Sequence, residues 1–443
     1  MTDIFKNKKA LYFVALKYHQ RILEPTMNAL RERGATIEAF TVQAEAGFEI
    51  TLNDMKMPYY HVCDFLDPYV SGTTNNAYRN IAERWQALTL IDQNLQQVPL
   101  VIMDKILRAA VESYYGIDKM LDTVKPDFVV SLHEINSWGK MLGYLCHKKH
   151  IPFFTFQEGL CYSVTSMYRW HTEYSDACVL WGEADRRVLI EANNDPARMP
   201  VVGVIDLPET IESSAVPERI EAARKAHEVP DGNKILIIFF AHAPYTHLLD
   251  TSLIHWMWNH PDVTVIFKFH PIQQKQLVES AMQTFGQIPS ARIVIDGDTY
   301  GLLGAAHACV LIGASTTGIE TLAFNKPLVE VMLPDSTYSY SARGAVPVAQ
   351  TLGEAAALTW SIAEQGESSE WYARRQAYLK DHFFNYNDGK FDHDTIPRIL
   401  KVWEDLLDKN ETPHTVRKLQ LVKGAKDDSE SIQRHGVQRS DDV

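Results

Sequence analysis

Two runs of apolar residues in the second half of the chain constrain its fold more than any other feature. The run Val263–Phe269 stops at His270-Pro271, and the run Ala308–Ile312 stops at the small and hydroxyl-bearing residues 313–318. Each run has the length and composition of a buried strand. Open α/β sheets bind ligands at the carboxyl ends of their parallel strands. This stretch therefore predicts an α/β domain with a ligand site beside His270 and the 313–318 loop.

The first half of the chain shows the same alternation of strand-like and helix-like segments. Strands are predicted at 10–16, 36–42, 128–132 and 152–156. A strand–helix–strand unit of this kind has a right-handed crossover and places its strands parallel. Between residues 51 and 122 the pattern becomes helical, and we expect these helices to pack around the sheet edge. A less favoured interpretation is that the apolar segment Val98–Met103 contacts a lipid or glycan substrate.

Prolines and changes of pattern divide the chain into two α/β domains. Pro208, Pro217 and Pro230 stand among Glu- and Ser-rich sequence, a composition typical of a linker. A polar tail without aromatic residues cannot bury enough apolar surface to order itself. The expected organisation is a Rossmann-like domain at 1–207, a linker at 208–232, a second Rossmann-like domain at 233–375, helices at 376–410 that return to brace the first domain, and a disordered tail at 411–443.

Composition and charge argue against several classes of protein. The formal charge of −13 and the absence of a lysine- or arginine-rich block are unfavourable for nucleic-acid binding. The five cysteines are odd in number and lack Cys-x-x-Cys spacing, which favours reduced thiols over disulfides or structural zinc. The apolar run near the N-terminus is too short to span a membrane. We therefore expect a cytoplasmic protein, and we leave open both homo-oligomers and peripheral contact with the inner face of the membrane.

A carboxylate follows one predicted strand of the first half in a promising context. Glu158 comes directly after the strand 152–156, and Gly159 permits a tight turn that would direct the carboxylate outward. Burial against Phe154 and Phe156 would raise the pKa of Glu158, as a general base near neutral pH requires. For Glu134, which follows the strand 128–132, a structural role is favoured. Besides Glu158, the candidate site residues of the first half are His19, His133, Glu134, Gln157 and Gly159, which would face the acceptor if the protein transfers a group.

The second half supplies candidates for binding a phosphate. Pro271 fixes the backbone directly after His270, which would hold the imidazole over the crevice, with Lys268 on the same strand. Backbone amides at the start of the helix that follows residues 313–318 attract an anion. The phrase Asp296-Gly297-Asp298 resembles a helix cap more than a metal site, so no metal is expected. The candidate residues for binding the phosphate of a donor substrate are His242, Lys268, His270, Pro271, Gly313, Ser315, Thr316, Thr317, Gly318 and Glu320.

Three phrases together resemble motifs of bacterial sialyltransferases and polysialyltransferases, and of capsule-synthesis enzymes that transfer Kdo. In chain order they are Gln157-Glu158-Gly159, Phe269-His270-Pro271 and Ser315-Thr316-Thr317. The resemblance covers residues 10–407 and implies the GT-B architecture, in which two Rossmann-like domains face a cleft. It implies that Glu158 is the catalytic base, that His270 contacts the CMP phosphate, and that Ser315 and Thr316 bind phosphate. Gln157 and Thr316 depart from the acid and the second serine of those motifs.

The second-half phrases also resemble CDP-glycerol glycerophosphotransferases, which have a His-Pro motif and a late Asp-Gly-Lys like residues 388–390. Those enzymes place a histidine where this chain has Glu158. UDP-N-acetylglucosamine 2-epimerase is a more distant relative of the same architecture. The leading hypothesis is a glycosyltransferase without cofactor or metal, which moves a sialic-acid-like or Kdo-like sugar from CMP to a hydroxyl of a surface glycan or glycolipid. The alternatives are CDP-glycerol or UDP-sugar chemistry, or nucleotide binding without catalysis.

Overall fold

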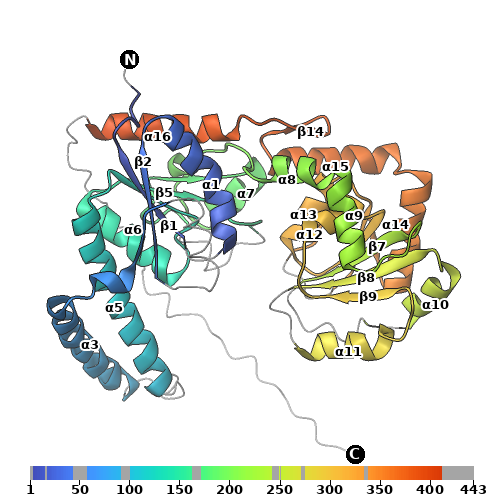
Figure 1. Ribbon diagram of the computed structural model, residues 1–443, viewed down its shortest axis with the longest axis horizontal. Coiled ribbons are helices and arrows are strands. Elements are labelled where there is room, and N and C mark those ends of the chain that lie inside the picture. The colour runs from blue at the N-terminus through green and yellow to red at the C-terminus, as the bar shows by residue number, and fades with distance from the viewer. Residues whose placement is uncertain are drawn as a thin grey trace, which may run out of the picture.

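The chain forms two parallel six-stranded sheets (Figure 1). The strand order is β3-β2-β1-β4-β5-β6 in the first sheet and β12-β11-β10-β7-β8-β9 in the second. Counted within its own domain, each sheet has the order 3-2-1-4-5-6 of the Rossmann fold. This confirms the prediction of two Rossmann-like α/β domains. The computed structural model describes residues 3–14, 17–42, 57–90, 100–161, 171–241, 249, 251–270, 275–333 and 338–411.

The first sheet is covered on both faces, which explains why its strands are apolar throughout. Along β1, Tyr12 packs toward α1 and the last helix, whereas Leu11 and Phe13 pack toward α5 and α6. The strands are β1 (Lys9–Phe13), β2 (Thr36–Thr41), β3 (Tyr59–His61), β4 (Phe128–Ser131), β5 (Phe153–Phe156) and β6 (Ala177–Val179). The helices are α1 (Lys17–Glu32), α3 (Pro68–Thr89), α5 (Leu100–Val124), α6 (Ser137–Lys149) and α7 (Glu183–Glu191), with 3-10 turns at Val62–Phe65 and Pro196–Arg198.

The second sheet has the same two-sided burial. Ile235, Ile237 and Phe239 of β7 pack toward α12 and α13, and the residues between them pack toward α10, α11 and α14. The strands are β7 (Lys234–Phe240), β8 (Val263–Phe269), β9 (Ala291–Val294), β10 (Ala308–Ile312), β11 (Leu328–Val331) and β12 (Val348–Ala349). The helices are α10 (Ser252–Asn259), α11 (Lys275–Phe285), α12 (Thr299–Ala305), α13 (Thr316–Ala323), α14 (Leu352–Gln365) and α15 (Ser369–His382).

The segment expected as a linker contains two helices, α8 (Leu207–Ser214) and α9 (Pro217–Ala226). Pro208 and Pro217 lie in the first turns of these helices, where the missing N–H costs no hydrogen bond. Both helices pack against α12 of the second domain, as Figure 1 shows. Gly304 of α12 lies so close beneath α8 that an added Cβ would be 2.2 Å from the carbonyl oxygen of Ser214.

The chain crosses between the domains twice, and one asparagine ties the crossings together. Val204, just before α8, donates its N–H to Oδ1 of Asn385 at 3.0 Å, and Nδ2 of Asn385 donates to the carbonyl of Val204 at 3.1 Å. Asn385 follows α15 and is buried. Between the crossing and the last helix, residues 386–391 form a hairpin of β13 (Tyr386–Asn387) and β14 (Lys390–Phe391). Its turn, Asp388-Gly389, has both φ angles positive, as a type I′ hairpin turn requires.

The last helix, α16 (Thr395–Glu411), returns to the first domain and lies across it in Figure 1. Trp403 of this helix is fully buried and stacks on Phe154 of β5, with ring centroids 5.1 Å apart and planes 8° from parallel. This confirms that the C-terminal helical region returns to the first domain.

Some predictions concern residues outside those that the structure describes. These are Val98 and Pro99 of the apolar segment, His242, Pro271, and the tail after residue 411. Among the described helices, none combines the length and apolar character needed to cross a membrane.

Replacing Trp403 tests how far the first domain depends on the returning helix. Trp403→Ala is expected to lower the free energy of unfolding by about 3–5 kcal/mol, because it leaves a cavity beside Phe154. Trp403→Phe keeps a ring there and removes an indole N–H that has no partner among the described residues. Its free energy of unfolding should therefore fall by less than that of Trp403→Ala. Urea unfolding followed by circular dichroism measures both, with Trp258→Ala, at a position 67% exposed, as the control. Equal stability of Trp403→Ala and wild type would contradict this role.

Candidate active site between the domains

Three side chains of the first domain meet at the carboxyl edge of its sheet. His133 follows β4, Glu158 follows the neighbouring strand β5, and His19 lies in the first turn of α1. Nε2 of His133 is 2.7 Å from Oε2 of Glu158, and the ring centroids of His19 and His133 are 6.1 Å apart. Both histidines are buried, whereas 32% of the Glu158 side chain is exposed. The fold thus brings three predicted candidates together, with the carboxylate as the accessible member.

The protonation of this cluster follows from its burial. Burial lowers the pKa of His19 to about 4, although the Glu158 carboxylate acts in the opposite direction. His19 is therefore neutral at pH 7. Nδ1 of His133 is buried and has no hydrogen-bond partner among the described residues, so the ring proton belongs on Nε2, which faces Glu158. In this tautomer His133 donates to the carboxylate and fixes its direction.

The same cluster has the donor types of a metal site. One ligand atom each from His19, His133 and Glu158 lie within 4.8 Å of one another, and two imidazoles with one carboxylate form a known zinc donor set. Two ligands of a tetrahedral zinc lie about 3.4 Å apart. The 2.7 Å separation of His133 and Glu158 is instead that of a charge-assisted hydrogen bond.

Glu134 has a different environment from Glu158. Its side chain is fully buried and accepts hydrogen bonds from the backbone N–H groups of Glu173, Tyr174 and Ser175. Burial raises the pKa of Glu134 to about 7, and the three backbone hydrogen bonds together with Lys140 oppose that rise. The carboxylate thus holds the 173–175 segment against the first domain, which supports the structural role favoured for it.

Gln157 braces the turn that carries Glu158. Its Oε1 accepts from the backbone N–H of Trp181 at 2.8 Å, and its Nε2 donates to the carbonyl of Gly159 at 3.0 Å. A carboxylate at this position could accept the first hydrogen bond but could not donate the second. The amide is therefore the side chain that satisfies both partners in this buried turn.

The phosphate-site candidates lie at the start of α13, across from Glu158. Ser315 is the N-cap of this helix, and its hydroxyl accepts from the N–H of Thr317 at 3.3 Å. Gly313 has φ +82°, a left-handed conformation that favours glycine. Gly318 leaves room for the ring of Tyr340, which an added Cβ would meet at 2.5 Å.

Tyr340 is a positioning residue that the sequence did not single out. Its hydroxyl donates to the carbonyl of Ser315 at 2.6 Å and accepts from the N–H of Ile319 at 3.0 Å. One phenol thereby fixes both ends of the first turn of α13. No sequence signal marks this role, because Tyr340 is more than twenty residues from the loop it holds.

A chain of polar side chains spans the two domains beside this helix. Arg21 of α1 pairs with Asp206 at 3.0 Å and lies over the ring of Tyr300, 5.0 Å from its centroid. The Tyr300 hydroxyl donates to Oε1 of Glu320 at 2.9 Å. Burial raises the pKa of Glu320 to about 7, whereas the hydrogen bond from Tyr300 lowers it. Of these four connected side chains, only Glu320 was a candidate from the sequence.

Lys268 uses two of its three ammonium donors on backbone carbonyls. It is buried, and its Nζ donates to the backbone carbonyls of Phe269, at 3.2 Å, and Ile295. Burial lowers the pKa of Lys268, and Asp296 acts in the opposite direction. Lys268 thus ties the end of β8 to the end of β9. His270 directly follows β8 and is exposed.

Asp298 has the capping role favoured for it. Its side chain accepts from the N–H of Gly301 in the first turn of α12, and both carboxylate oxygens also pair with Arg219 of α9.

The raised pKa of Glu320 predicts a pH-dependent stability. A folded-state pKa near 7 against an ordinary value of 4.5 means that the folded protein binds this proton more tightly than the unfolded chain. Stability is then lost as pH rises from about 4.5 through about 7. Glu320→Gln cannot ionise and still accepts from Tyr300, so we expect it to exceed wild type by about 1–3 kcal/mol at pH 8 and to match it near pH 4.5. Urea unfolding at pH 4.5 and pH 8 measures the stability of the variant and of wild type, with Glu221→Gln on α9 as an exposed control. The same difference in stability between Glu320→Gln and wild type at both pH values would contradict the raised pKa of Glu320.

The comparisons with known proteins give matches in structure only. No protein-family model and no curated protein sequence matches the chain. Among solved structures, UDP-GlcNAc 2-epimerase from Neisseria meningitidis, bound to UDP-GlcNAc, matches with a TM-score of 0.59 and 11% identity over 90% of this chain and 100% of that chain.

Two further solved structures named for other proteins match at a similar level. A glycosyltransferase from Rickettsia africae has a TM-score of 0.55 and 14% identity over 90% of this chain and 99% of its own. HepE from Anabaena, in complex with UDP and glucose, has a TM-score of 0.53 and 13% identity over 90% of this chain and 100% of its own. At these identities the matches establish the fold, and the chain has the two-domain GT-B-like fold of these proteins.

Proposed function

We propose that the chain is a glycosyltransferase that moves a sugar from a nucleotide-activated donor to an acceptor hydroxyl. The observation that carries this proposal is the contact between the two candidate half-sites. A Cβ added to Gly159 would lie 3.2 Å from Oγ1 of Thr316, and Glu158 and Thr316 line one pocket with Glu320. A carboxylate and the start of a helix thus face the same space, as transfer of a sugar from a phosphate requires.

Glu158 would remove the proton of the acceptor hydroxyl. The acceptor oxygen then attacks the anomeric carbon of the donor, and the bond from that carbon to the phosphate oxygen breaks. His133 keeps the Glu158 carboxylate pointed toward the acceptor through the 2.7 Å hydrogen bond. Because His19 stays neutral at pH 7, it does not add a positive charge that would make Glu158 a weaker base.

The start of α13 would receive the negative charge that develops on the departing phosphate. Unpaired N–H groups and the helix dipole favour an anion at this end of a helix. The hydroxyl of Thr316 adds a donor, and Tyr340 holds the turn in place through the carbonyl of Ser315. Stabilisation of this kind acts without reorganisation because the donors are already fixed. Our proposal keeps His270 as a second phosphate contact.

For the donor we propose a CMP-linked sugar of the sialic-acid or Kdo type. The order and residues of the three motif phrases support this choice. Two of the structural neighbours were solved with UDP-GlcNAc or UDP, which makes a UDP-linked sugar the direct competitor. The proposed acceptor is a hydroxyl of a surface glycan or glycolipid.

Nucleotide release separates these donors. We expect CMP release from CMP-linked sialic acid or CMP-linked Kdo to rise when a glycan acceptor is added, and UDP-GlcNAc to give no acceptor-dependent product. Coupled release of CMP or UDP, with mass spectrometry of the acceptor, measures both. Turnover of only UDP-sugars would overturn the donor assignment, and conversion of UDP-GlcNAc without any acceptor would replace transferase by epimerase activity.

Glu158→Gln tests the catalytic base. Loss of the proton acceptor is expected to lower kcat by about 10²–10⁴-fold while nucleotide affinity stays within about threefold of wild type. Thr316→Val should instead weaken nucleotide binding, since it removes a hydroxyl at the phosphate position and keeps the shape of the side chain. Initial rates and calorimetric titration with CMP and UDP measure the two effects, with Glu191→Gln on the exposed side of α7 as the control. Unchanged kcat in Glu158→Gln would remove this residue from the mechanism.

A further inference from the structure

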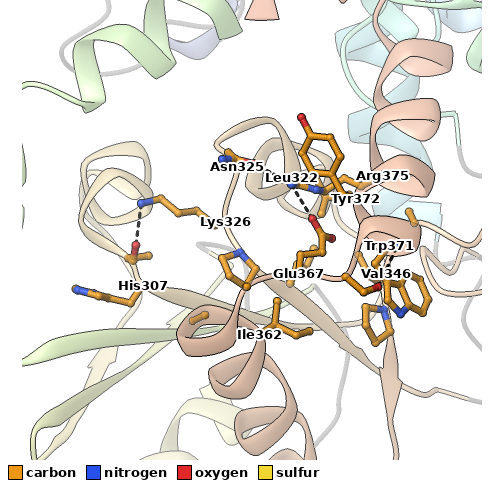
Figure 2. Close-up of a pocket in the computed structure, with 18 residues that line it drawn as sticks. His307, Leu322, Asn325, Lys326, Val346, Ile362, Glu367, Trp371, Tyr372 and Arg375 are labelled. Atoms are coloured by element: carbon orange, nitrogen blue, oxygen red, sulfur yellow. Dashed lines mark hydrogen bonds and ion pairs between the residues drawn. The ribbon is translucent and has the colours of Figure 1, made fainter. Parts of the chain in front are cut away.

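A second pocket lies in the second domain, away from the candidate active site. Its volume is about 480 Å³, and Figure 2 shows side chains from α14, α15 and the segments before β10 and β11 around it. His307 directly precedes β10, and Lys326 and Pro327 directly precede β11. The pocket is therefore at the amino ends of these strands, whereas the proposed active site is at their carboxyl ends. Its volume lies in the range of small-molecule sites.

Helix α13 connects the two places. Ser315 caps its first turn at the active-site end, and Asn325, in a left-handed conformation with φ +56°, lies just beyond its last turn at the pocket. A helix of eight residues spans about 12 Å. This length separates the two sites clearly, so a ligand in the pocket would not be the donor or acceptor of the proposed transfer.

A buried arginine in the pocket retains an unused donor. Arg375 of α15 is only 6% exposed, and its guanidinium pairs with Oδ1 of Asn325 at 2.6 Å and with the Glu367 carboxylate at 2.8 Å. Its Nε is buried and has no hydrogen-bond partner among the described residues. Leaving such a donor unsatisfied costs free energy. Arg375 also lines the pocket, so an anionic group there would pair with its positive charge.

Lys326 adds a second cation to the pocket wall. Its Nζ donates to the carbonyls of Gly304 at 3.0 Å and Ala306 at 2.8 Å, and an ammonium has three donors. With Arg375 and Glu367, the lining therefore carries a net positive charge. The cation of Lys326 also lowers the pKa of neighbouring His307, in addition to the larger effect of burial.

The rest of the lining is apolar and partly aromatic. Trp371 of α15 is half-buried, and Leu322, Val346 and Ile362 complete the wall (Figure 2). A flat hydrocarbon body could stack on the indole and displace water from these side chains. The combination of an apolar wall with a few charged groups is typical of sites for small organic molecules.

We propose that this pocket binds a small organic anion, in which a carboxylate or a phosphate monoester is attached to a flat apolar body. The anionic group satisfies Arg375 and Lys326, and the body lies against Trp371. This site is independent of the proposed transferase activity, and its test uses no donor or acceptor.

Binding of phenyl phosphate and phenylacetate to the full chain tests the proposal. Calorimetric titration and saturation-transfer NMR, up to roughly 10 mM ligand, should show saturable binding of at least one anion. Uncharged benzyl alcohol should bind at least about tenfold more weakly, because it cannot satisfy the cations. The preferred anion identifies which of the two groups the site takes.

Variants locate the site. Trp371→Ala removes the stacking surface and Ile362→Trp fills the pocket, so each should weaken binding of the anion by about tenfold or more. Trp258→Ala and Lys275→Gln, both at exposed positions, serve as matched controls and should bind like wild type. Lack of saturable binding, equal binding of benzyl alcohol, or binding lost in Thr316→Val but retained in Ile362→Trp would overturn the proposal.

Discussion

The paired hydrogen bonds between Asn385 and Val204 are the interaction on which the arrangement of the two domains depends. The chain leaves the first domain at Val204 and returns after Asn385, so one side-chain amide joins both crossings. Gly203 has no room for a side chain there, since a Cβ would lie 2.6 Å from Asn385. Trp403 then anchors the returning helix in the core of the first domain. Together these contacts hold the carboxyl edges of the two sheets toward each other.

The proposed chemistry is divided between those two edges. The first domain contributes a carboxylate whose direction His133 fixes, and the second contributes a helix start that Tyr340 fixes. In the proposed reaction neither half could transfer a sugar by itself, because the base acts on the acceptor hydroxyl and the anion site acts on the departing phosphate. The side-chain contacts that connect Arg21 through Tyr300 to Glu320 lie beside both halves. A change in the domain angle would therefore alter the site and this chain of contacts together.

Three features of the sequence have local structures that their residue patterns did not indicate. Lys268 lies at the end of β8, and two of its ammonium donors go to backbone carbonyls. A pattern of residue types does not show which acceptors lie nearby. Pro208 and Pro217 were interpreted as linker residues, yet they begin α8 and α9. Proline is common both in linkers and in the first turn of a helix, so it cannot distinguish the two. Asp388 and Gly389 form a hairpin turn, and Lys390 begins the strand that follows it.

The sequence by itself determined the two Rossmann-like sheets and the strand ends at which Glu158 and the 313–318 loop lie. It could do so because buried parallel strands are continuous apolar runs, and because their carboxyl ends always share one edge. Only the tertiary structure decided that His19 and His133 join Glu158, that Tyr340 fixes α13, and that Arg375 faces a pocket. These contacts join residues that are distant in the chain. They depend on how whole domains and helices pack, which no local pattern of residues encodes.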